Sequence, residues 1–243
     1  GAVPDPGEPE RVAETAASLG LRYVVLTQVA RDDLKDEGAG HFARTIEAVH
    51  ARIPGGQVEV LTADFNGRAE LVDIVMAARP EVFGHNIETV RRLTPEVRGR
   101  ARYERSLEVL SLAAAVVRRE GRGQVKSGIM VGFGEEKDEV VDTLRDLRTA
   151  GCSLVTIGQY LRPTREQRPV ARYWEPSEFA EMEAEARALG FVEVAAGPLV
   201  RSSYRADRLH AAATAAAAAT AGAAPTAGDR DAAGPMEAEG RPR

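Results

Sequence analysis

The chain has 243 residues, of which 44% are hydrophobic and 28% are charged, so it can bury a sizeable core in one large domain or two small ones. Its net charge of −5 is opposite in sign to the basic surface of a nucleic-acid-binding domain, and we expect no nucleic-acid partner. No apolar run approaches the roughly 20 residues of a membrane helix, and no signal peptide opens the chain. We therefore expect a cytoplasmic protein without membrane contact.

Six short runs rich in Val, Ile and Leu, each bounded by Gly, Pro or charged residues, predict β-strands. In chain order they are residues 22–27, 57–61, 82–87, 125–131, 153–158 and 191–195. Between them, apolar residues recur with helical spacing over residues 8–19, 40–51, 103–119, 136–149 and 176–189. This alternation predicts an α/β fold with a parallel sheet, as in a barrel or a doubly wound domain. In such barrels the reactive groups lie at the C-terminal ends of the strands.

The composition changes after Leu209. Residues 210–228 are almost entirely Ala, Thr and Gly, and residues 229–243 are polar with Gly and Pro. An Ala-rich tract can form a helix but has no apolar stripe to bury, so we expect disorder with at most a transient helix. We therefore divide the chain into a barrel domain over residues 1–209 and an Ala-rich disordered tail over residues 210–243.

Cys152 is the single cysteine of the chain. One thiol excludes a disulfide framework, and it cannot hold an iron–sulfur cluster by itself, because such clusters usually take four protein ligands. Cys152 lies between a predicted helix and a predicted strand, where a small buried thiol is the usual interpretation.

Polar side chains follow the first strand and lie in the third. The first strand ends at Thr27, and the acidic loop after it is typical either of a site or of a solvated turn. In the third strand, alternation turns Asn86 and Glu88 to the same side. An amide and a carboxylate side by side can hold a ribose diol, because both accept hydrogen bonds from hydroxyl groups. A buried structural network is the alternative interpretation, because buried polar groups are costly unless they are paired.

The later strand ends offer weaker signals. The fourth strand leads into a glycine-rich turn with Gly132, Gly134 and Glu135, whose backbone can approach a ligand closely. The exit of the fifth strand could place Leu161 against an adenine ring or could only turn. After the last strand, two serines follow Arg201, but no base is visible that would make them nucleophiles.

Taken together, these stretches resemble the lipoyl synthase family. The matching segments are residues 21–27 (LRYVVLT), 31–34 (RDDL), 38–43 (GAGHFA), 85–90 (HNIETV), 126–128 (KSG), 132–135 (GFGE), 156–161 (TIGQYL) and 197–204 (GPLVRSSY). Each segment alone is a weak signal. They are specific as a set because they follow one another in the family's order from about residue 4 to residue 206.

The resemblance implies a partial (β/α)6 TIM-type barrel of the radical-SAM kind. It implies a sulfurtransferase that uses two [4Fe–4S] clusters and S-adenosyl-L-methionine to insert two sulfur atoms at C6 and C8 of a protein-bound octanoyl group. The octanoylated lipoyl carrier would be the E2 domain of a 2-oxoacid dehydrogenase or the H protein of glycine cleavage. An electron donor would be a further partner. Such an enzyme serves lipoate biosynthesis and protein lipoylation.

Individual residues acquire roles by the same resemblance. The implied contacts to S-adenosylmethionine are Thr27, Asn86, Glu88, Gly132, Gly134, Glu135 and Leu161. The auxiliary cluster would take a serine ligand, for which we expect Ser203, with Ser202 as second choice. Lys126 and Arg201 are the candidates for neutralising carboxylate or cluster charge. Lys126 could also serve as the base or Schiff-base amine of a cluster-free aldolase or isomerase, but it lies at the start of its strand, which argues against that role.

The chain also departs from the family pattern. The family's cluster-binding cysteines, including the C-x3-C-x2-C loop, lie upstream of the segment that matches residues 4–9, and the first barrel strand lies with them. We therefore expect an open sheet edge in this chain. Residues that differ from the usual family ones are Gln28, Ala30, Ala63, Gly84, Gln167 and Arg205. Two interpretations compete: a fragment of a working enzyme, which the unbroken order of motifs favours, and a degenerate non-catalytic paralogue that only docks a lipoyl-carrier domain.

Overall fold

The computed structural model describes residues 3–222 of the chain. Within them, six parallel strands form one sheet whose spatial order follows the chain. The strands are β1 (Tyr23–Thr27), β2 (Gln57–Leu61), β3 (Val82–Gly84), β4 (Gln124–Val131), β5 (Leu154–Gln159) and β6 (Glu193–Gly197). The helices are α1 (Glu8–Ser18), α2 (Ala39–Arg52), α3 (Ala69–Ala77), α4 (Thr94–Val97), α5 (Tyr103–Glu120), α6 (Lys137–Thr149), α7 (Pro176–Ala188) and α8 (Ala206–Gly222).

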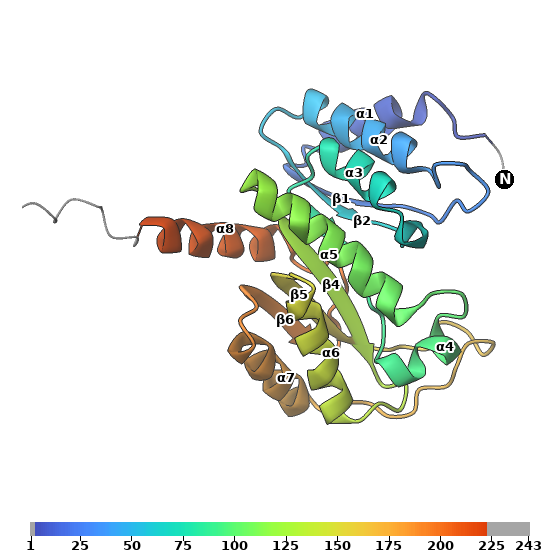
Figure 1. The fold of residues 1–243 in the computed structure, drawn as a ribbon, viewed down its shortest axis with the longest axis vertical. Coiled ribbons are helices and arrows are strands. Elements are labelled where there is room, and N and C mark those ends of the chain that lie inside the picture. Colours follow the sequence, from blue (N-terminus) through green and yellow to red (C-terminus); the bar gives the residue numbers. More distant parts are fainter. Residues whose placement is uncertain (1–2, 223–243) are drawn as a thin grey trace, which may run out of the picture.

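This arrangement confirms the predicted α/β fold with a parallel sheet. Helices α1 to α3 lie beside β1 and β2, and α5 to α7 lie beside β4 to β6 (Figure 1). Because β1 and β6 are the two edge strands, the sheet is open and does not close into a full barrel. Within residues 3–222, no helix is long and apolar enough to cross a membrane.

Most predicted elements lie within one or two residues of their expected ranges; strand β3 is the exception, and helices α3, α4 and α8 were not among the predicted helices. Strand β3 ends at Gly84, three residues before its predicted end, because the chain bends out of the sheet there. Helix α3 buries Leu71, Val72, Val75 and Met76 on one side, which is helical spacing. The segment is apolar almost throughout, so this spacing does not stand out in the sequence.

Helix α8 begins in the segment expected to be a disordered tail. Its Ala213 packs with Val82 and Leu154, the first residues of β3 and β5. The ring of His210 lies 5.9 Å from the ring of Tyr23, and its Nδ1 is 3.0 Å from Oε1 of Gln124. Thus α8 covers the N-terminal end of the sheet, and the described helix continues to Gly222. The rest of the predicted tail, residues 223–243, lies outside the described residues.

A buried ion pair crosses the same N-terminal end of the sheet. Nζ of Lys126 lies 2.7 Å from Oε1 of Glu59, and both side chains are almost fully buried. The hydroxyl of Tyr23 donates to Oε2 of Glu59 at 2.8 Å. Burial and the neighbouring Glu59 carboxylate together raise the pKa of Tyr23. Three strands (β1, β2 and β4) are therefore joined by one satisfied polar network.

The structure of this network predicts that removing one of its charged side chains lowers the stability of the fold. Lys126→Met should destabilise the fold by about 3–5 kcal/mol, because it leaves the Glu59 carboxylate buried without a cation. The double variant Lys126→Met/Glu59→Leu should recover part of that loss, since it removes both buried charges. Urea unfolding followed by circular dichroism measures both values. Loss of the exposed pair between Arg187 and Glu183 is the control and should cost at most about 1 kcal/mol.

Candidate functional site

The C-terminal strand ends gather the predicted site residues at one edge of the sheet. Parallel pairing in chain order makes this unavoidable, because all six described strands run in the same direction. Thr27 is exposed at the end of β1, and Leu161, just beyond β5, is 42% exposed. Asn86 and Glu88 are half-buried beyond β3. These four side chains therefore border the face on which a barrel binds its ligands.

The backbone after β3 is bent so that Asn86 and Glu88 share one side. Strand β3 stops at Gly84, and Glu88 returns to the sheet as an isolated bridge to Ile129 of β4. The Glu88 N–H donates to the Gly128 carbonyl at 3.0 Å, and its own carbonyl accepts from the Met130 N–H at 2.8 Å. Glu88 adopts φ +67°, a left-handed conformation that costs a non-glycine residue energy and that clusters at functional sites.

The two neighbours of Asn86 point into the protein. The His85 ring spans from the Thr62 carbonyl at 2.9 Å to the Ser106 hydroxyl at 3.0 Å. Burial lowers the pKa of His85 to about 4, so the ring is neutral at physiological pH. The Ile87 N–H donates to the Ser127 hydroxyl at 3.1 Å. His85 and Ile87 thus anchor the bend, and they leave Asn86 and Glu88 on the ligand side.

Asn86 and Glu88 form a polar pair, and Gly128 leaves the space that the Asn86 side chain occupies. A side chain at Gly128 would place its Cβ 2.8 Å from Oδ1 of Asn86 and 2.9 Å from Oγ1 of Thr156. Burial raises the pKa of the Glu88 carboxyl, while the positive charge of Arg98 and a hydrogen bond with Asn86 oppose that rise. The pair therefore offers amide and carboxylate oxygens in a partly desolvated place, which suits neutral hydroxyl groups.

The glycine turn, which comprises Gly132–Glu135, is held together by its own carboxylate. Oε1 of Glu135 accepts the Gly132 N–H at 2.6 Å, and Oε2 accepts the Phe133 N–H at 2.9 Å. Oε1 also accepts the indole N–H of Trp174 at 3.0 Å. Three N–H donors therefore bind the Glu135 carboxylate, which shapes the turn; the expected contact of Glu135 with the cofactor stays a prediction.

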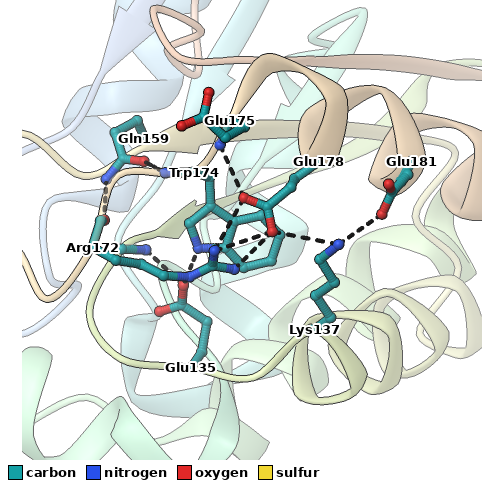
Figure 2. Close-up of polar contacts among 9 residues, drawn as sticks. Glu135, Lys137, Gln159, Arg172, Trp174, Glu175, Glu178 and Glu181 are labelled. Atoms are coloured by element: carbon teal, nitrogen blue, oxygen red, sulfur yellow. Dashed lines mark hydrogen bonds and ion pairs between the residues drawn. The ribbon is translucent and has the colours of Figure 1, made fainter.

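Gln159, at the end of β5, fixes the opposite side of this turn. Its Nε2 donates to the carbonyls of Tyr160 and Arg172, each at 3.1 Å, and its Oε1 accepts the Trp174 N–H at 2.9 Å (Figure 2). A Cβ on Gly132 would lie 2.2 Å from Nε2 of Gln159 and 2.9 Å from the Arg172 carbonyl. The absence of a side chain at Gly132 thus serves close contact within the protein, and the proposed approach of a ligand to its backbone stays a prediction.

The end of β1 opens into a cleft at the sheet edge. The cleft has a volume of about 310 Å³. Thr27 and Gln28 line it together with Phe42 of α2 and Pro4 near the start of the chain. Nε2 of Gln28 donates to the Glu37 carbonyl at 2.9 Å, while its buried Oε1 has no partner among the described residues. Gln28 therefore lines this cleft and carries a buried acceptor without a partner among the described residues.

The serine segment after β6 is held against the end of β5. Nη1 of Arg201 donates to the Val200 carbonyl at 2.8 Å, and a Cβ on Gly158 would come within 2.3 Å of that carbonyl. The Tyr204 N–H closes a turn by donating to the Arg201 carbonyl at 2.8 Å. Ser203 is exposed and Ser202 is half-buried. Arg201 is thus occupied by backbone carbonyls, and the Ser203 hydroxyl has no hydrogen bond in the part of the chain that the structure describes.

Two sequence candidates lie away from this edge. Lys126 is the third residue of β4 and is engaged with Glu59 near the N-terminal end of the sheet. Cys152 precedes β5, is fully buried, and has a pKa that burial raises. Over residues 3–222, no group of three or more His, Cys, Asp or Glu side chains could hold a metal ion. The residues present therefore do not fit an iron–sulfur cluster.

Sequence reasoning did not find Gln159, Trp174 or Arg98 as parts of this edge. Gln159 lies inside the matched segment TIGQYL, but its amide contacts residues 13 and 15 positions later, which spacing cannot reveal. A single tryptophan in 243 residues was an available signal, because a buried indole usually needs a partner for its N–H.

Comparisons with known proteins agree with this geometry. Residues 1–147 match the family model of the radical SAM superfamily. In fold, the chain is similar to the [FeFe]-hydrogenase maturase HydG from Carboxydothermus hydrogenoformans (TM-score 0.58, 15% identity, 76% of this chain and 44% of that one). It is also similar to methylornithine synthase (TM-score 0.51, 16% identity, 65% and 44% of the two chains). The open parallel sheet and the sequence match together define a member of the radical SAM superfamily.

Sequence relatives narrow the family. The chain is 57% identical over 202 residues to lipoyl synthase 2 of Gloeobacter violaceus, covering 83% of this chain and 69% of that protein. It is 55% identical over 214 residues to the lipoyl synthase of Acidothermus cellulolyticus, covering 87% and 64%. The chain therefore belongs to the lipoyl synthase family, and it spans about two thirds of the length of these relatives.

The glycine turn generates a prediction with a matched control. Gly132→Ala should destabilise the protein by about 2–4 kcal/mol, because the added Cβ meets Gln159 and the Arg172 carbonyl and because φ is +111°. Gly134→Ala has nearly the same backbone strain, at φ +105°, but its Cβ would meet only the Ala171 Cβ at 3.6 Å. It should cost about 1–2 kcal/mol. Equal losses of unfolding free energy in the two variants would contradict a role for close contact.

Proposed function

We propose that this chain is the barrel of a lipoyl synthase, which inserts two sulfur atoms at C6 and C8 of a protein-bound octanoyl group. The single observation that carries the proposal is the 57% identity over 202 residues to a lipoyl synthase. The strand ends support it, because the family segments HNIETV, GFGE and TIGQYL all meet at one edge of the sheet.

The strand ends fit S-adenosylmethionine as the proposed cofactor. The Asn86–Glu88 pair would hold the ribose hydroxyls, since its oxygens lie on the ligand side and Gly128 leaves room for the amide. The remaining proposed contacts are Thr27, the backbone of Gly132 and Gly134, and Leu161 against the adenine. When bound to a reduced cluster, S-adenosylmethionine supplies the radical chemistry of this family. The protein orients the molecule and excludes water from it.

The two [4Fe–4S] clusters of the family are not matched by ligands in this chain. Its single thiol, Cys152, is buried away from the strand ends. Ser203 remains the proposed serine ligand of an auxiliary cluster, whose cysteine ligands this chain does not supply. Its greater exposure supports that choice over the half-buried Ser202. Arg201 would position the serines, because its guanidinium holds backbone carbonyls beside them.

The proposed partners follow from the reaction. They are an octanoylated E2 domain or an octanoylated H protein as substrate, and an electron donor. The proposed setting is the cytoplasm. The second candidate function is a non-catalytic paralogue that docks the carrier domain alone, and the substituted positions at the strand ends, Gln28 and Gly84 among them, favour it.

The cluster assignment yields a direct prediction. After anaerobic reconstitution with iron and sulfide, the chain as written should retain much less than one [4Fe–4S] cluster per molecule, because it offers no set of thiolate ligands. Iron and sulfide analysis with absorption spectroscopy measures the content. Stoichiometric cluster uptake accompanied by a spectral change on adding S-adenosylmethionine would contradict the prediction.

A chimera tests the function itself. The cysteine-bearing N-terminal part of the Acidothermus cellulolyticus relative is joined ahead of this chain, and lipoyl formation on an octanoylated H protein is followed by mass spectrometry. Activity is the expected result, whereas an inactive chimera with both clusters bound supports the non-catalytic paralogue.

The same chimera separates the two serines. Ser203→Ala should lower lipoyl formation by roughly 10-fold or more, the scale at which metal sites respond to altered ligation. Ser202→Ala is the matched control and should retain most activity. Equal loss in both variants would remove the preference for Ser203, and the iron content would show whether a cluster was lost.

A further inference from the structure

The segment between β5 and α7, residues 160–175, forms a strap that is attached to the glycine turn. The Ala171 N–H donates to the Gly132 carbonyl at 2.8 Å, and Nη2 of Arg168 donates to the Phe133 carbonyl at 3.3 Å. The rings of Phe133 and Tyr160 are stacked, with centroids 4.0 Å apart. An irregular segment is thus joined to the turn at several points along its length.

Trp174 makes the innermost of these attachments. Its side chain is 3% exposed, and its indole N–H reaches Oε1 of Glu135, the oxygen that also accepts the Gly132 N–H. Glu135 therefore has three N–H donors, of which two come from the turn and one from the strap. A buried carboxylate is stabilised only while its donors are in place, so removal of one weakens the hold on the other two.

The indole is itself held from two sides. The guanidinium of Arg172 lies 4.4 Å from the ring centroid of Trp174, and Arg172 forms a bidentate pair with Glu178 of α7 at 3.0 and 3.1 Å. Lys137 of α6 lies 3.4 Å from the same Glu178 carboxylate (Figure 2). The main-chain N–H of Trp174 is fixed by Gln159. Strand β5 therefore holds the Trp174 backbone, and helices α6 and α7 hold the Arg172 side chain that covers the ring.

We propose that Trp174 is a positioning residue. Its indole N–H completes the donor set of Glu135 and so fixes the backbone of Gly132 to Gly134 in the form that faces the cofactor. This proposal rests on the proposed function, which places S-adenosylmethionine along the same turn. The ring acts through Glu135 and need not touch a ligand.

Site-resolved hydrogen exchange of the whole chain tests the positioning role. Trp174→Phe keeps an aromatic ring and removes the N–H, and the amides of Gly132 and Phe133 should exchange at least roughly tenfold faster. Amides near the start of β4, such as Lys126, should be unchanged. Tyr173→Phe is the matched control, because Tyr173 is 66% exposed on the same strap and should leave the turn unaffected.

A double-mutant cycle separates this hydrogen bond from general packing. Glu135→Ala, which removes both acceptor oxygens, should also accelerate exchange in the turn. Because both changes remove the Trp174–Glu135 hydrogen bond, the double variant Glu135→Ala/Trp174→Phe should exchange little faster than Glu135→Ala alone. Unchanged exchange in Trp174→Phe, or fully additive effects in the cycle, would overturn the positioning role.

A second experiment adds S-adenosylmethionine and tests whether the turn that Trp174 holds contacts the cofactor. Trp174 is the only tryptophan of the chain, so its emission reports this place alone. In the wild type, S-adenosylmethionine should slow exchange at Asn86, Glu88 and the turn and should change the Trp174 emission. In Trp174→Phe, protection should persist at Asn86 and fall in the turn.

The outcomes of the second experiment are distinct. Protection of Asn86 and Glu88 without any protection of the turn would overturn the role of Trp174 toward the cofactor and leave the proposed function standing. Protection at neither place would overturn the proposed cofactor site. The exchange cycle would still decide whether Trp174 fixes the turn.

Discussion

Parallel pairing in chain order is the constraint on which the rest of this structure depends. Every described strand ends at the same edge, so segments more than 100 residues apart in sequence, such as HNIETV and GPLVRSSY, contribute to one face. Parallel strands need crossovers, and the helices between them shield the outer face of the sheet. The loops after each strand can vary in sequence and conformation more than the strands and helices can. In this chain those loops carry the family's sequence motifs.

Polar and charged side chains are fully paired at one end of the sheet and only partly paired at the other. At the N-terminal end, Lys126, Glu59 and Tyr23 satisfy one another and are closed off further by α8. At the C-terminal end, Asn86 and Glu88 remain half-buried on a strained backbone, with Arg98 as the nearby positive charge. A fully paired network contributes to the unique fold, whereas partly satisfied polar groups beside open space are what a ligand site requires. The contrast favours the C-terminal end of the sheet as the candidate ligand site.

Much of this could be predicted from the sequence, and the limits have physical causes. Apolar runs predicted the strands because a sheet covered by helices needs continuous burial. Strand alternation also predicted a shared side for Asn86 and Glu88, but these residues lie beyond the end of β3, and a bend in the chain gives them that side. The bend after Gly84 could not be read, because it depends on Ser127 and on a ring buried against α5. The engagement of Glu135 by Trp174 joins positions 39 residues apart, and no local spacing encodes it. Helix α8 was missed because an Ala tract lacks an amphipathic pattern, although its first turns do contact the sheet.

Contacts within the protein shape the proposed cofactor site. Gly128 admits the Asn86 amide, Gly132 admits the Gln159 amide, and Glu135 collects donors from the turn and the strap. None of these contacts involves a thiolate or a metal. The cluster ligands that the family requires would therefore add reactivity to an edge that the barrel has already shaped. Such a division allows the same barrel to serve a complete enzyme or a carrier-docking paralogue, and the ligand set that accompanies the barrel decides between them.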